Sequence, residues 1–260
     1  MKIALHLFAL RNHIKKEEDM INTLHAIKAM GYDAIHVSGI PDWKEERLLL
    51  LKKTCEELNL EIVGTHVRAF QANGSLSSII KNHQLLDTHY IGIGSMPESY
   101  DRRNLTHYQD FILQCNKMAK ELETHHLTLT YHHHAFEFCK MNGLYPIDII
   151  MQNMMTSPMK LEVDIYWLQY AGINPLEFIQ KYQHHIAMIH LKDMRIAIVD
   201  HWNTAQQFCA IGDGNIAYRR IIPQLRTLPI EWLIIGQDEF YGADPWEELH
   251  KSLYMVKGLI

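Results

Sequence analysis

The chain has 260 residues, of which 47% are hydrophobic and 21% are charged, as in a globular protein with a sizeable core. Its formal net charge of −5 and pI near 6.4 offer no basic field for a polyphosphate backbone, so we expect no nucleic-acid partner. No run of 18 apolar residues could cross a membrane, and four widely spaced cysteines suit reduced thiols. The polar His6 interrupts the first apolar segment, so a signal peptide is not expected and a cytoplasmic location is predicted.

Short apolar segments bounded by turn residues recur along the chain. Each is rich in β-branched or aromatic residues and too short for an ordinary helix, so each predicts a β-strand. The eight predicted strands cover residues 2–10, 33–40, 61–67, 90–94, 126–132, 160–166, 185–191 and 232–238.

Longer segments with apolar residues at helical spacing lie between these strands. In the first, Ile21, Leu24, Ile27 and Met30 form one stripe, and Gly31 stands where a helix commonly ends. Similar patterns occupy residues 43–60, 102–124, 144–155, 174–183, 215–226 and 244–257. Strand and helix therefore alternate, which predicts a (β/α)8 TIM barrel forming a single domain over residues 1–260. The competing doubly wound sheet lacks a G-x-G-x-x-G after its first strand.

Polar side chains gather at the ends of the predicted strands, where the loops of such a barrel meet around one pocket. The residues concerned are His66, His132, His134, Glu137, Asp164, His190, Gln237 and Asp238. Two acids and an imidazole from neighbouring strands make a mixed nitrogen and oxygen site, which suits Mn²⁺, Mg²⁺, Co²⁺ or Zn²⁺. Each residue also has an ordinary alternative, because buried histidines often bond carbonyls and an acid at a strand end often caps the next helix.

Several short motifs occur in a fixed order: YHHHAFEF, VDIYW, HLKDM, IGDGNIAY and WLIIGQDEF. In this order they resemble the sugar phosphate isomerase/epimerase group of xylose isomerase-like TIM barrels, over essentially the whole chain. The short Gly-x-Gly turn at 211–215 is interpreted first as a tight turn, with an anion site at the following helix as the alternative.

The resemblance implies roles for individual positions. Glu137 matches a metal-ligating glutamate that also serves as the catalytic base, and Asp164 and His190 match two further metal ligands. For the substrate, a small sugar or polyol, the predicted contacts are His66, His133, His134, Trp167, Lys192 and Asp238. A homo-oligomer is left open, because exposed barrel faces often pair.

One departure from the family pattern concerns the eighth strand. The family places a glutamate there as fourth ligand and second base, whereas this chain has Gly236. Epimerisation by two bases is therefore compromised unless Asp238, His133 or water replaces the missing carboxylate.

The predicted function is a metal-dependent sugar isomerase or epimerase that abstracts a proton next to a carbonyl. The alternatives are a non-catalytic sugar-binding barrel and a related keto-polyol dehydratase. A DNA-repair endonuclease with three zinc ions is disfavoured by the acidic charge balance.

Overall fold

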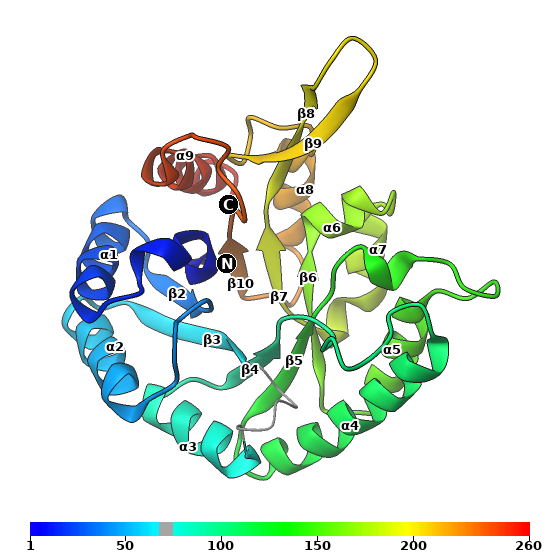
Figure 1. Ribbon diagram of the computed structural model, residues 1–260, viewed down its shortest axis with the longest axis horizontal. Coiled ribbons are helices and arrows are strands. Elements are labelled where there is room, and N and C mark those ends of the chain that lie inside the picture. The colour runs from blue at the N-terminus through cyan, green and yellow to red at the C-terminus, as the bar shows by residue number, and fades with distance from the viewer. Residues whose placement is uncertain (68–74) are drawn as a thin grey trace.

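The computed structural model describes residues 1–67 and 75–260, and its centre is a closed barrel of eight parallel strands (Figure 1). All eight predicted strands are present, and each pairs with its neighbours around the barrel, with β10 closing it against β1. The first was predicted to reach residue 10 but ends at His6, where a 3-10 helix begins, and the last ends at Ile235, three residues earlier than predicted. Their bounds are β1 Lys2–His6, β2 Ala34–Val37, β3 Glu61–Val67, β4 Tyr90–Ile93, β5 Thr128–His132, β6 Lys160–Asp164, β7 Ile186–Leu191 and β10 Trp232–Ile235.

Helices surround the barrel (Figure 1). They are α1 Glu17–Met30, α2 Glu45–Glu57, α3 Leu76–Leu86, α4 Leu105–Glu123, α5 Pro146–Met154, α6 Ile165–Tyr170, α7 Pro175–Tyr182, α8 Tyr218–Leu225 and α9 Pro245–Lys257. Short 3-10 helices cover η1 Leu7–His13, η2 Phe136–Phe138 and η3 Gln183–His185. Within the described part of the chain, no helix is both long and apolar enough to cross a membrane.

The sixth strand ends two residues earlier than predicted. Its last residue, Asp164, accepts hydrogen bonds from the backbone N–H groups of Tyr166 and Trp167, at 2.9 and 3.3 Å. This N-cap begins α6 directly at Ile165. The chain therefore leaves the barrel immediately after Asp164.

The barrel interior has an apolar layer and a polar layer. Near the N-terminal ends of the strands, a separate buried cluster is formed by Ala4, Ala34, Val63, Met188, Trp232 and Ile234. Toward the C-terminal ends, the register pairs His6 with His36, His132 with Glu162, and Asp164 with His190. The apolar layer closes one end of the barrel, and the polar layer forms the floor of the other.

A two-stranded antiparallel hairpin, β8 Asp193–Ile198 and β9 Thr204–Cys209, was not predicted. It projects away from the barrel (Figure 1), and Ile198, Val199 and Trp202 near its tip are exposed. Since its outer part buries little, the hairpin has no strong apolar pattern to mark it in the sequence.

The turn around Gly212 is held by the first residue of this hairpin. The Asp193 carboxylate accepts backbone N–H groups from Met194, Gly212, Gly214 and Ile216, at 2.8 to 3.2 Å. The N–H groups that would attract an external anion already bind this carboxylate. Of the two alternatives, the tight turn is therefore the one that the structure supports.

Gly214→Ala should destabilise the protein, because a Cβ at this position would overlap the Asp193 carboxylate and the carbonyl oxygen of Met194. We expect the free energy of unfolding to fall by about 1 to 3 kcal/mol, as for other overpacked sites. Chemical denaturation measures the change. The control is Gly258→Ala, whose Cβ would meet its neighbours at an ordinary 3.6 Å. Equal denaturation midpoints for the two variants would contradict this account of the turn.

Candidate functional site

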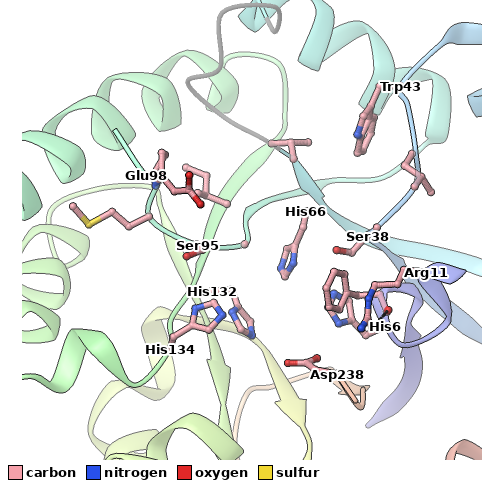
Figure 2. A pocket seen from close by; sticks show the side chains of 18 of the residues that line it. His6, Arg11, Ser38, Trp43, His66, Ser95, Glu98, His132, His134 and Asp238 are labelled. Atoms are coloured by element: carbon pink, nitrogen blue, oxygen red, sulfur yellow. Dashed lines mark hydrogen bonds between the residues drawn. The ribbon is translucent and has the colours of Figure 1, made fainter. Parts of the chain in front are cut away.

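A cavity of about 960 Å³ opens at the C-terminal end of the barrel (Figure 2). Figure 2 shows the imidazoles of His6, His66 and His132 and the carboxylate of Asp238 converging on one space. Four of the predicted substrate-binding residues line this cavity: His66, His134, Lys192 and Asp238. Part of the polar layer of the barrel, including His6 and His132, thus lines a pocket of ligand size.

Asp164 lies behind Lys192 and His132, which line the cavity, and it is saturated with partners. Its Oδ1 caps α6, and its Oδ2 lies 3.1 Å from the Lys192 ammonium and 3.2 Å from His132 Nε2. Burial by itself raises the pKa of Asp164, but Lys192 and the His132 hydrogen bond hold it well below its usual range. Asp164 is therefore an ionised carboxylate that both caps a helix and binds a buried cation.

Lys192 bridges two carboxylates. Its Nζ lies 3.1 Å from Asp164 and 3.0 Å from Asp238, and its side chain is only 3% exposed. Burial lowers the pKa of Lys192, but the two carboxylates outweigh this effect and raise it. The lysine is a fixed ammonium ion, and Asp238 at 22% exposure is the partner that faces the cavity.

A second carboxylate, Glu162, lies deeper on the same face of β6. Its Oε1 accepts a hydrogen bond from Thr130, and its Oε2 lies 2.7 Å from His66 Nε2 and 2.9 Å from His190 Nε2. A third imidazole nitrogen, His36 Nε2, lies 3.7 Å away. Burial raises the pKa of Glu162, but His66 and His36 hold it well below its usual range.

Two groups of side chains have the composition and spacing of metal ligands. One consists of His132, Asp164 and His190, and the other of His36, His66, Glu162 and His190, with ligand atoms in each group within 4.8 Å of one another. The structure thus brings the predicted ligands Asp164 and His190 together.

The predicted site residues do not include His6, His36 or Glu162. The signal that could have found them is the alternation of inward and outward side chains along a strand. His6, His36 and Glu162 each lie on the inward face of their strand.

The predicted base and ligand Glu137 lies apart from Asp164 and His190 and has hydrogen-bond partners of its own. It lies on the 3-10 helix after β5, where its carboxylate accepts hydrogen bonds from the Tyr131 hydroxyl and, at 2.8 Å, from the His134 backbone N–H. It belongs to neither ligand group formed by the described residues. Because Tyr131 packs outside the barrel against Phe111, the structure does not bring Glu137 together with Asp164 and His190.

Two other predicted residues lie behind the cavity wall. The ring of His133 packs against Phe138 and Phe178, and its Nε2 accepts the backbone N–H of Asp164. Trp167 packs against His134 at 5.2 Å between ring centroids. Neither His133 nor Trp167 lines the cavity, so neighbouring side chains separate both residues from it.

Gly236 faces His6 and Lys192. A Cβ at this position would lie 3.3 Å from His6 Cβ and 3.5 Å from Lys192 Cε. The space where the resemblance implies a fourth metal ligand therefore borders a histidine and an ammonium ion, and the nearest carboxylate along the chain is Asp238.

Comparison with known proteins gives a consistent family. Residues 24–254 match the model of the xylose isomerase-like TIM barrel family. Inosose dehydratases from Clostridium botulinum and Clostridium beijerinckii are 30% and 26% identical over 154 residues, which are 55% of this chain and 51% of theirs. The match thus spans about half the length of these curated relatives.

Solved structures resemble the whole chain at low identity, and this likeness concerns the fold. A sugar phosphate isomerase/epimerase from Parabacteroides distasonis has a TM-score of 0.75 at 17% identity, covering 98% of this chain and 93% of that one. D-allulose 3-epimerase from Methylomonas sp. has a TM-score of 0.71 at 10% identity, covering 100% and 98%. Because the family model matches most of its length, the chain belongs to the xylose isomerase-like TIM barrel family.

Proposed function

We propose that the protein is a dehydratase-type enzyme that removes a proton next to the carbonyl of a small keto-polyol and then expels a β-hydroxyl group. The observation that carries this proposal is the Lys192 ammonium held between Asp164 and Asp238, with Asp238 facing the cavity. The similarity to inosose dehydratases over half the chain supports this substrate class.

The mouth of the barrel does not fit the divalent metal that the resemblance implies. Both oxygens of Asp164 already have partners, and Gly236 supplies no fourth donor. A second cation beside Lys192 would also be repelled, by about 4 kcal/mol for unit charges 4 Å apart at an effective dielectric constant of 20. In this proposal Lys192 supplies the positive charge, and no step depends on a metal at Asp164.

The reaction needs one acid/base group and one cation. As Asp238 takes the proton, the electrons of the C–H bond form a C=C bond, and the carbonyl oxygen becomes an oxyanion beside Lys192. The enolate electrons then return to re-form the carbonyl and expel the β-hydroxyl group. Protonated Asp238 gives this group its proton, so the products are an enone and water.

Epimerisation is less well supported than a reaction with one base. It needs proton donors and acceptors on both faces of the reacting carbon. Gly236 has no side chain to serve as one, and Glu137 lies outside the cavity, where it is hydrogen-bonded to Tyr131. Aldose–ketose isomerisation begins with the same proton abstraction by Asp238 and belongs to the same substrate panel.

Asp238→Asn should lower turnover by about 100-fold or more, the usual contribution of a general base. The assay follows deuterium exchange at the α-carbon and enone absorbance with an inosose and a panel of ketoses. Asp213→Asn, an exposed acid outside the cavity, is the matched control and should keep wild-type turnover. If the wild type binds these compounds but exchanges no proton, the non-catalytic sugar-binding alternative replaces the proposal. Full turnover in Asp238→Asn would assign the base to another residue.

Glu137→Gln should keep turnover and change the pH dependence of stability. Burial raises the pKa of Glu137 from 4.5 to about 7, so the folded state retains a proton that the unfolded chain releases. This stabilisation is fully present below pH 4.5 and is lost as the pH rises to 7, which amounts to roughly 3 kcal/mol.

The neutral glutamine imitates protonated Glu137, since it can donate to Tyr131 and accept from His134. Relative to the wild type, the variant should therefore gain stability between pH 4.5 and 7.5, measured by denaturation at several pH values. Parallel stability curves, or a large loss of turnover, would show that Glu137 is ionised or catalytic after all.

A further inference from the structure

The polar layer of the barrel, at and beneath the cavity lining, contains more imidazole nitrogens than hydrogen-bond partners. His6 and His36 each have both ring nitrogens buried and without a hydrogen bond to the described residues, and His190 has one. The three rings lie 5.1 to 5.4 Å apart between centroids. A buried nitrogen without a partner costs about 1 to 3 kcal/mol, so a ligand that binds these nitrogens would be favoured.

Two glycines, one in β4 and one directly after it, make room for this cluster of side chains. A Cβ on Gly92 of β4 would lie 2.6 Å from both Glu162 Oε1 and His66 Cδ2. A Cβ on Gly94 would lie 2.9 Å from His66 Nδ1. Since Gly92 and Gly94 have no side chains, the Glu162 carboxylate and the His66 ring can approach to 2.7 Å.

We propose that His36, His66, Glu162 and His190 bind a nitrogen-preferring divalent transition metal, of which Zn²⁺ is the type, inside the barrel directly beneath the cavity. The site lies deeper along β6 than Asp164 and uses β2, β3, β6 and β7. It is independent of the proposed Lys192 and Asp238 chemistry, which requires no metal.

The donor set identifies the class of cation. Three imidazoles and one carboxylate suit a tetrahedral Zn²⁺ or Co²⁺ site, whereas Mg²⁺ and Ca²⁺ prefer oxygen ligands. The four ligand atoms already lie within 4.8 Å of one another, and tetrahedral donors at about 2.1 Å from a metal are roughly 3.4 Å apart. Small side-chain movements therefore suffice to complete the site.

The surroundings also favour this group over the one at Asp164. Thr130 holds the second oxygen of Glu162, as residues around metal sites commonly do. The nearest partners of Glu162 Oε2 are neutral or protonatable imidazoles, which a metal can replace as partners, whereas Asp164 is bound to the permanent charge of Lys192. Glu162 is thus the carboxylate that can accept a divalent ion.

The test compares two buried carboxylates on the same face of one strand, Glu162→Gln and Asp164→Asn. Zn²⁺ affinity is measured by titration calorimetry after chelation, and Co²⁺ is used to record the visible absorption of a tetrahedral centre. We expect Glu162→Gln to weaken binding by about 100-fold or more and to abolish the tetrahedral spectrum. Asp164→Asn should bind within a few-fold of the wild type, and Mg²⁺ should not compete.

His36→Asn provides a second variant should Glu162→Gln fail to fold, as judged by circular dichroism. It removes a ligand without removing the buried charge, and it should also lose the tetrahedral Co²⁺ spectrum. The proposal is overturned if the wild type does not bind Zn²⁺, if His36→Asn binds normally, or if Asp164→Asn loses binding as severely as the Glu162 variant. Turnover of the Asp238 variant, measured separately, decides the proposed function.

Discussion

Two carboxylates buried on the inward face of β6 determine the arrangement of the barrel mouth. Glu162 and Asp164 are both fully buried, and an uncompensated charge at such a position would be strongly destabilising. Each is stabilised differently: Asp164 by an ammonium ion and a helix N-terminus, and Glu162 by hydrogen bonds with two imidazoles and a threonine hydroxyl. The positions of Lys192, Thr130 and the histidines follow from this requirement.

The replacement of a family glutamate by Gly236 fits the same balance of charge. With Asp164, Asp238 and Glu162 already present, a further carboxylate beside His6 and Lys192 would leave the floor short of positive charge. Lys192 and Asp238 instead form a pair whose carboxylate faces the cavity. In the proposed function Lys192, in place of a metal, carries the positive charge at the mouth, and the pocket remains polar.

Much of the fold and part of the site follow from the sequence, for identifiable reasons. The eight strands are apolar segments that alternate with helices. The alternation of side chains along a strand places both Asp164 and His190 on the inward face of the barrel. This alternation of side chains no longer holds beyond the end of a strand. Glu137 comes after the end of β5, and its direction is set by the Tyr131 hydroxyl and a 3-10 turn, which no periodicity predicts. His6 and His36, by contrast, could have been found from the alternation of inward and outward side chains along the first two strands.

The polar floor is costly for stability, which is an argument that it has a function. The layer beneath it shows that this barrel can be filled with apolar side chains such as Met188, Trp232 and Ile234. Burial lowers the pKa of His36 to about 4, so its ring is neutral at physiological pH and cannot neutralise Glu162 there. A chain selected for stability alone would replace such rings with aliphatic side chains. The retained imidazoles surround a carboxylate, and neutral imidazole with a carboxylate is the donor set of a metal centre.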